Sequence, residues 1–184
     1  MLTLDGELLQ DLRLQLEHLS ESRSGFVSSQ PYRLAALQRQ WPHSIEVHES
    51  PYPLHEYNCF MFALGLAGNE RYLKRQGKRE IHLAGSEFAR WLIDSGLLTE
   101  LRDYETEIAP QGIGFYFDAT GKCTHAGLAL SNGRMLSKWG TGQLLEHGYV
   151  ETPLSYGNIL RFFEGVSIDR SFEYLERFDH RQAG

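Results

Sequence analysis

The hydrophobic pattern changes period along the chain, and this change constrains the fold more than any other feature. Up to about residue 96, apolar residues recur at three- and four-residue spacing in segments that Gly and Pro end, which is typical of helices. Beyond residue 112 they fall in short runs rich in β-branched and aromatic side chains, which is typical of strands. These runs are Ile113–Phe117, Cys123–Leu130, Arg134–Trp139 and Asn158–Phe163. Helices followed by strands predict an α+β fold with an antiparallel sheet.

The N-terminal segment has the pattern of an amphipathic helix over residues 4–20. Its apolar stripe consists of Leu4, Leu8, Leu12, Leu16 and Leu19. Such a stripe predicts packing against another part of the protein, or binding of a protein partner through this helix. The polar stretch Ser20–Ser29 predicts a flexible joint, and Pro31–Arg39 a short second helix. We therefore expect a helical extension over residues 1–40 and one further domain over residues 41–184.

Two further helices are expected before the strands. The apolar run Cys59–Leu66 is stopped by Gly65 and Gly68, which predicts a short buried helix with Cys59 at its start. The second helix is expected over Ser86–Ser95, with Ser86 as its N-cap and Gly96 after its end.

Charge and composition exclude several classes of function. The 24 acidic residues outnumber the 18 basic ones, giving a net charge of −6, which argues against nucleic acid as a partner. No segment is long and apolar enough to cross a membrane, and no ordinary signal peptide precedes the domain. The two cysteines, Cys59 and Cys123, are expected to be thiols in a reducing compartment. We expect a cytoplasmic protein, or an effector or toxin delivered by a route that needs no signal peptide.

Cys59 and His125 are the candidate catalytic pair. A thiol in the first turn of a helix lies near unpaired N–H groups, which favour the thiolate. Strand alternation places His125, Gly127 and Ala129 on one face, where small neighbours leave room for a helix to cross. Imidazole within reach of a thiol is the minimum machinery for nucleophilic acyl transfer.

Three segments of the chain, in this order, resemble the NlpC-type branch of the papain-like cysteine peptidases. They are residues 57–64 (Tyr-Asn-Cys-Phe-Met-Phe-Ala-Leu), residues 112–117, and residues 125–136, which begin with His-Ala-Gly. The resemblance covers about residues 52–163. It implies a Cys-bearing helix packed on an antiparallel sheet, with Cys59 as nucleophile and His125 as base.

The resemblance also implies a third polar residue, which matches Ser137. Lys138 and His147 are the alternatives for this orienting role, and Tyr57 and Asn58 are candidate oxyanion donors. A three-residue hairpin loop over residues 131–133, with Gly133 in the left-handed conformation, pairs Leu130 with Arg134 and puts Ser137 on the face of His125. A two-residue turn would put Lys138 there instead.

Other interpretations of these residues remain open. Cys59 can be a small buried core residue, and His125 a core histidine. Cys123, expected on the face of His125, can be a redox bystander. A zinc site from His55, Cys59, Cys123 and His125 has suitable ligand chemistry but lacks a paired Cys-x-x-Cys motif.

These observations lead to one functional hypothesis and two alternatives. We expect a cysteine hydrolase or acyl transferase that acts on an amide or isopeptide bond of a peptide or protein substrate, without metal or other cofactor. The alternatives are a catalytically silent papain-fold module that binds a protein, and a protein-glutamine deamidase that uses the same Cys59 and His125.

Overall fold

The computed structural model of the chain describes residues 6–20, 26–77, 82–101, 112–130 and 133–182. The helices in these ranges are α1 (Gly6–Ser20), α2 (Phe26–Leu37), α3 (Cys59–Ala63), α4 (Glu70–Gln76), α5 (Ser86–Asp94), the 3-10 helix η2 (Leu154–Tyr156) and α6 (Ile168–Gln182). The strands are β1 (Glu46–His48), β2 (Ile113–Phe117), β3 (Cys123–Ala129), β4 (Arg134–Lys138), β5 (Leu144–Gly148) and β6 (Ile159–Phe163). None of the helices in the described ranges is both long and apolar enough to cross a bilayer.

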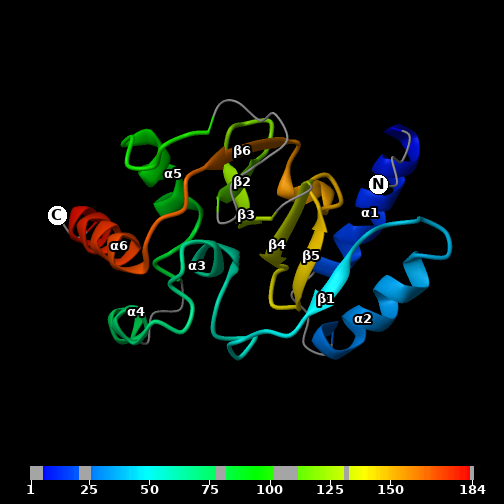
Figure 1. Cartoon of the computed structure of the whole chain (residues 1–184), viewed down its shortest axis with the longest axis horizontal. Helices are drawn as coiled ribbons and strands as arrows, with labels where there is room; N and C mark the ends of the chain where they lie inside the picture. The colour runs from blue at the N-terminus through cyan, green and yellow to red at the C-terminus, as the bar shows by residue number, and fades with distance from the viewer. Residues whose placement is uncertain (1–5, 21–25, 78–81, 102–111, 131–132, 183–184) are drawn as a thin grey trace.

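The six strands form one antiparallel sheet in the order β1-β5-β4-β3-β2-β6. Helices cover both faces: α3 to α6 lie on one side, and α1 and α2 lie on the other (Figure 1). The predicted α+β fold with an antiparallel sheet is thus confirmed.

The side of the sheet that faces α3 carries the larger core. It joins Met61 of α3, Phe88 of α5 and Leu175 of α6 to Phe115 of β2 and Ala126 of β3, all of them buried. Complete burial of side chains this large contributes about 2 kcal/mol each, so α3 is held firmly against β3.

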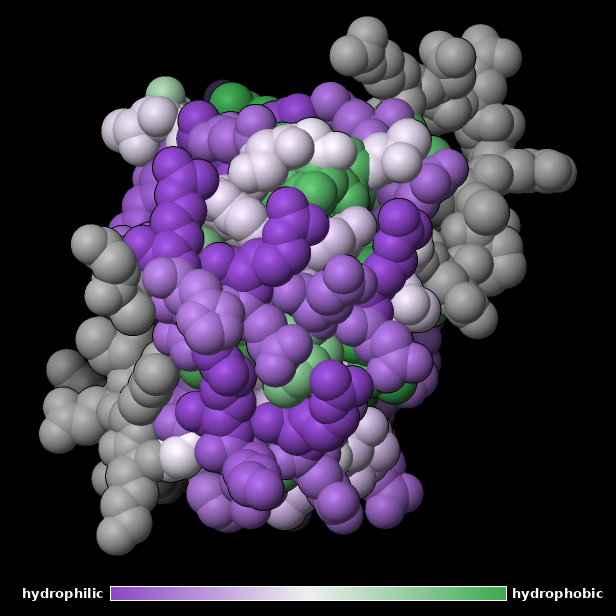
Figure 2. Space-filling view, turned by 90° about the vertical axis from the view of Figure 1, so that its left-hand side faces the viewer, coloured by the Kyte–Doolittle hydropathy of each residue, from purple (hydrophilic) through white to green (hydrophobic). Residues whose placement is uncertain are grey.

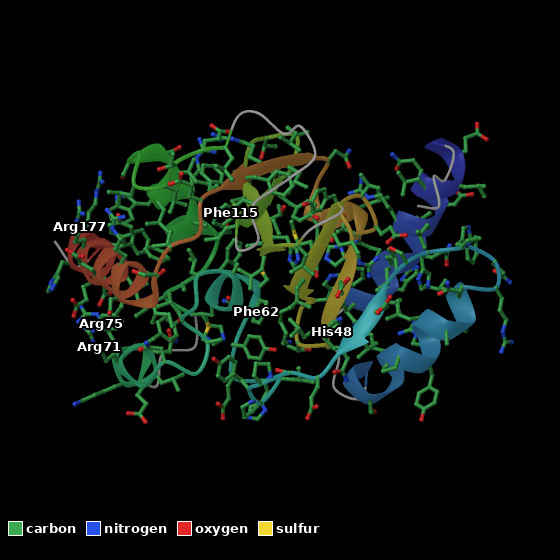
Figure 3. All side chains as sticks on the ribbon, in the orientation of Figure 1. His48, Phe62, Arg71, Arg75, Phe115 and Arg177 are labelled. Carbon is green, nitrogen blue, oxygen red and sulfur yellow. The ribbon has the colours of Figure 1, made fainter. Side chains whose placement is uncertain are left out.

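The outer end of this layer is polar. Arg71 and Arg75 of α4 pair with Asp169 and Asp179 of α6, at 3.5 and 2.8 Å. Figure 3 shows Arg71, Arg75 and Arg177 gathered at this end of the molecule, and Figure 2 shows that its surface is mainly hydrophilic.

The opposite face of the sheet is covered by α1 and α2. The core on this side consists of Leu12, Leu16, Leu19, Leu34, Ile45, Trp139, Leu145 and Tyr156. The predicted packing of the leucine stripe is confirmed for Leu12, Leu16 and Leu19, whereas Leu8 is 41% exposed and Leu4 lies outside the described residues. Residues from both sides of the expected boundary at residue 40 share this core, so α1 and α2 form a layer of the same fold.

A buried arginine fixes α1 to the segment before β6. Arg13 is 6% exposed, and its guanidinium donates to the carbonyl oxygens of Thr152 (2.9 Å) and Gly157 (2.6 Å) and to Oδ1 of Asn158 (2.6 Å). Burial lowers the pKa of Arg13, but the guanidinium stays charged because its ordinary pKa is above 12. The segment that carries η2 is therefore held by α1.

Most predicted elements are present, with shifts at their ends. The second helix was expected over Pro31–Arg39, but α2 begins at Phe26 and contains Pro31. The buried Gln30 ties this helix to its neighbours: it donates to the carbonyl oxygen of Leu19 and accepts from the N–H of Gln143. The N-cap of α5 is Gly85 rather than Ser86, whose hydroxyl donates to the carbonyl oxygen of Cys123 instead.

Strands β1 and β5 and helices α4 and α6 were not predicted. Two of the five residues of β5 are charged or titratable, Glu146 and His147, so its sequence lacks an apolar run. It is a strand because β4 and β1 pair with it on both sides.

The predicted hairpin register is confirmed. The N–H of Leu130 donates to the carbonyl oxygen of Arg134, Leu128 pairs with Leu136, and Gly133 has a φ of 75°. The tip of the loop, residues 131–132, lies outside the described residues. Successive side chains of a strand point to opposite faces of the sheet. With this register, Ser137 lies on the face of His125, and Lys138 lies on the face that meets α3.

A bulge corrects the expected position of Cys123. Tyr116 pairs with His125, but Phe117 pairs with Cys123, so Thr124 is an extra residue in β3. The bulge turns the side chain of Cys123 away from the face of His125 and into the core beside α3.

Candidate functional site

Cys59 is the first residue of α3, as predicted. Its neighbour Asn58 caps the helix: Oδ1 accepts from the N–H of Met61 at 2.8 Å, and Nδ2 donates to the carbonyl oxygen of Ala84 at 2.9 Å. Both ends of the Asn58 amide are engaged in holding the helix start. The side chain of Asn58 therefore positions Cys59. Contrary to the expectation, its amide is occupied by these two hydrogen bonds and does not point to an oxyanion site.

Backbone N–H groups surround the thiol of Cys59. The N–H groups of Cys59, Phe60 and Ala126 all act on the sulfur and favour its charged form. The pairs between β3 and β4 are Leu128 with Leu136 and Ala129 with Met135. Ala126 comes before these paired residues in β3, and its N–H acts on the sulfur of Cys59.

Burial nevertheless outweighs these donors. Cys59 as a residue is partly exposed, but protein atoms surround its sulfur, and this desolvation raises the pKa of the thiol to about 11. The expectation of a low-pKa thiolate is therefore wrong for the molecule at rest. At neutral pH, Cys59 is a thiol.

Lys138 is a buried cation on the same side of the sheet. Its side chain is fully buried; Nζ donates to the carbonyl oxygen of Gly140 at 2.9 Å and lies 5.2 Å from the ring centre of Tyr57. Burial lowers the pKa of Lys138 to about 8, while the neighbouring Cys59 opposes this shift. From the sequence, Lys138 was expected only as an alternative residue for orienting His125. The hairpin register places the two side chains on opposite faces of the sheet.

His125 lies on the other face of β3, one residue from Ala126. Its ring stacks on Tyr156, with centroids 3.8 Å apart and planes 13° apart, and Nε2 has no hydrogen-bond partner among the described residues. Burial, and then the charge of His147, lower the pKa of His125 well below 6.5. It is a neutral imidazole.

Cys59, on α3, meets β3 at Ala126, and His125 is the preceding residue of β3, on the opposite face. No hydrogen bond joins the two side chains in the described part of the chain. The small residues beside His125 do not accommodate the helix, which corrects the expectation from the sequence. A Cβ on Gly127 would lie 2.7 Å from Met135 and 2.8 Å from Ser137, so side chains of β4 fill this space. Helix α3 crosses the opposite face.

Ser137 orients a different histidine from the one expected. The Nδ1–H of His147 donates to the carbonyl oxygen of Gly148 (2.9 Å), so its Nε2 accepts from the hydroxyl of Ser137 (2.8 Å). The indole N–H of Trp139 donates to the same hydroxyl (3.1 Å). Ser137 is therefore hydrogen-bonded to His147 and Trp139 and not to His125. His147, which was expected to approach His125 from a loop, lies in β5 and contacts Ser137 instead.

The residues of the alternative zinc site are not gathered together. His55 is 84% exposed beside Glu56, and burial raises the pKa of the Cys123 thiol. In the described ranges, no group of three or more His, Cys, Asp or Glu side chains could hold a metal ion.

A cavity of about 620 Å³ lies beside the other end of α3. Its walls include Phe62 and Gly65 next to Ile113 and Leu128, with Glu164 at its margin. Figure 3 shows Phe62 near the centre of the molecule. This cavity was not predicted, because its walls come from five separate segments and share no motif.

The fold and the site define an α+β protein whose helix-borne thiol is packed against the central strand of an antiparallel sheet. Residues 50–164 match the model of a family described as Domain of unknown function (DUF7689). The match covers more than half of the 184 residues, and the chain belongs to this family. No curated protein and no solved structure matches the chain.

The family match contains every residue of the candidate site, from Tyr57 to Tyr156. Helices α1, α2 and α6 lie outside it.

Proposed function

We propose that the chain is a cysteine hydrolase or acyl transferase of NlpC-like, papain-type architecture that cleaves an amide or isopeptide bond. The observation that carries the proposal is the setting of the Cys59 thiol. It begins a helix, three backbone N–H groups act on its sulfur, and one of them belongs to the residue after His125. Donors aimed at a sulfur that becomes charged also suit the oxyanion of an acyl-transfer intermediate.

The chemistry follows from these positions. Cys59 Sγ attacks the carbonyl carbon, its proton passes to the imidazole of His125, and the carbonyl oxygen becomes an oxyanion near the N–H groups. Collapse of the intermediate breaks the C–N bond, and the imidazole returns the proton to the leaving amine. Water, or another amine in a transferase, then releases the acyl group from Cys59.

The protonation states at rest fit such a sequence. Burial keeps the thiol protonated, and it keeps His125 unprotonated and able to accept a proton. The two side chains lie on opposite faces of β3 in the free protein, so substrate binding has to rearrange this part of the sheet before the proton can pass from Cys59 to His125.

Acyl-enzyme trapping tests the proposal. The folded protein is incubated with p-nitrophenyl acetate, and the peptide that contains Cys59 is analysed by mass spectrometry for a hydroxylamine-sensitive acetyl group. We expect acetylation of Cys59, its loss in Cys59→Ala, and a rate reduced at least about 100-fold in His125→Ala. Cys123→Ala is the control and should acetylate normally.

A peptide library then separates the reaction types. Hydrolysis releases a new amine from a peptide or isopeptide bond, whereas deamidation of a glutamine side chain by the same pair releases ammonia. No acetylation of Cys59 in a folded protein would rule out the nucleophile.

The second candidate is a catalytically silent module that binds a protein. The packing of His125 on Tyr156 and the use of Ser137 by His147 favour it, because they leave the imidazole without a polar orienter among the described residues. α1 and α2 also expose apolar surface for such a partner, with Leu14 50% and Tyr32 79% exposed. Absence of acylation together with normal folding would favour this function.

A further inference from the structure

Among the described residues, Lys138 is the fully buried lysine, and the proposed chemistry leaves its place in the fold unexplained. Its side chain has no solvent exposure, yet within the described ranges a single carbonyl oxygen, that of Gly140, accepts from Nζ. An ammonium group has three donors, and burying it costs several kcal/mol unless an anion or further acceptors compensate. A methionine of similar length would fill the space at lower cost.

The position of Lys138 relates it to Cys59. Strand pairing sets it on the face of β4 that meets α3, next to Ala126, whose N–H acts on the sulfur. Nζ lies 5.2 Å from the ring centre of Tyr57, two residues before Cys59. Strand, loop and helix thus bring the ammonium group to the thiol.

Apart from His125, which is a neutral imidazole, the other titratable groups near the thiol are acids. Cys123 of β3, Tyr156 of η2 and Tyr57 have pKa values that burial raises, so all are neutral at pH 7. In the described part of the chain, Lys138 is the cation whose charge lowers the pKa of Cys59.

We propose that Lys138 is a positioning residue for the reaction at Cys59, and that its buried ammonium group holds the negative charge that forms on the sulfur when the thiol gives up its proton. The catalytic purpose of this role rests on the proposed function, whereas the effect of Lys138 on the reactivity of the Cys59 sulfur can be measured without it. Lys138 remains protonated during the reaction. The thiol proton passes to His125, and the ammonium group compensates the charge that stays behind.

The pH profile of Cys59 alkylation tests this role. Second-order rate constants for iodoacetamide are measured by peptide mass spectrometry at pH 7.0 and pH 9.5 for the wild type, Lys138→Met and Lys138→Gln. Lys74→Met, on the exposed face of α4, is the matched control. Because the pKa of Lys138 is about 8, its charge is present at pH 7.0 and absent at pH 9.5.

We expect wild-type Cys59 to react about tenfold faster than Cys59 in either variant at pH 7.0, which corresponds to one pKa unit, and equally fast at pH 9.5. Both variants should unfold at the same temperature as the wild type or higher, since they remove a buried charge. A structural lysine would instead give variants of lower stability with unchanged alkylation. Equal rates at pH 7.0, or the same difference at both pH values, would overturn the proposal.

Failure of this inference and failure of the proposed function are distinguishable. Alkylation needs no substrate, so a missing charge effect with normal acetylation of Cys59 refutes only the role of Lys138. A clear charge effect without acetylation refutes only the acyl-transfer function.

Discussion

The ring of Tyr156 lies flat against the imidazole of His125, with 3.8 Å between centroids and 13° between planes. Tyr156 belongs to η2, which lies between the two carbonyl groups that accept from Arg13, those of Thr152 and Gly157. The N–H of Gly140 faces the Tyr156 hydroxyl, while the carbonyl oxygen of Gly140 accepts from Lys138. One turn after β4 therefore contacts both the residue that packs on the histidine and the lysine beside the cysteine.

Replacing Tyr156 should change the protonation of His125. Burial is the main cause of its lowered pKa, and the stacked ring supplies part of that burial. In Tyr156→Leu we expect water to reach the imidazole and its pKa to move up toward 6.5, with about 3 kcal/mol lost in the free energy of unfolding. Tyr156→Phe keeps the ring and should leave the pKa nearly unchanged. NMR titration of His125 measures both; an unchanged pKa in Tyr156→Leu would contradict the explanation.

Ser137→Ala should act on stability through His147. Removing the hydroxyl leaves Nε2 of His147 and the indole N–H of Trp139 without their partner, and both side chains are buried. We expect a loss of about 2 kcal/mol in the free energy of unfolding, measured by urea denaturation. Ser95→Ala, at the exposed end of α5, is the control and should change it by less than about 0.5 kcal/mol. Equal losses in the two variants would argue against the Ser137 network.

The sequence predicted those parts of the site that depend on local pattern. Cys59 at a helix start follows from an apolar run bounded by glycines, and the register of Ser137 and Lys138 follows from the hairpin loop. The face of the sheet that α3 covers depends instead on long-range packing. Met135 fills the space beside Gly127, and no local pattern reports which face a helix will take.

The partners of the polar residues were also beyond local pattern. His147 lies in β5, whose polar sequence gave no strand prediction, so its bond to Ser137 was not foreseen. The raised pKa of Cys59 likewise depends on long-range packing that no local pattern reports. The helix start favours the thiolate, but burial by the surrounding core outweighs it, and burial is a property of the folded molecule.

Arg13→Met should destabilise the attachment of α1. Methionine keeps the length of the side chain, but it leaves the oxygens of Thr152, Gly157 and Asn158 without their donor. We expect a loss of about 3 kcal/mol in the free energy of unfolding by urea denaturation, because these bonds are buried and made to a charged group. Arg39→Met, at an exposed position, should cost less than about 0.5 kcal/mol. A loss in Arg13→Met no larger than this would refute the anchoring role.

His147 should make the protein less stable as the pH falls below 6.5. Burial lowers its pKa in the folded state to about 4, whereas the unfolded chain has the ordinary value of 6.5. Between these values the unfolded state binds a proton that the folded state does not. Stability is therefore fully present above pH 6.5 and is lost as the pH falls toward 4, by up to about 1.4 kcal/mol per pH unit.

The variant His147→Gln isolates this contribution. His125 and His82 also have lowered pKa values, so the wild type should lose stability through all three histidines, and the variant through one fewer. We expect the slope of unfolding free energy against pH, measured by urea denaturation from pH 4.5 to 6.0, to be smaller in His147→Gln by about one proton. His55→Gln, whose ring is 84% exposed, should keep the wild-type slope. Equal slopes in His147→Gln and His55→Gln would show that the buried imidazole of His147 does not resist protonation, and the assignment of its Nε2 as acceptor from Ser137 would fail with it.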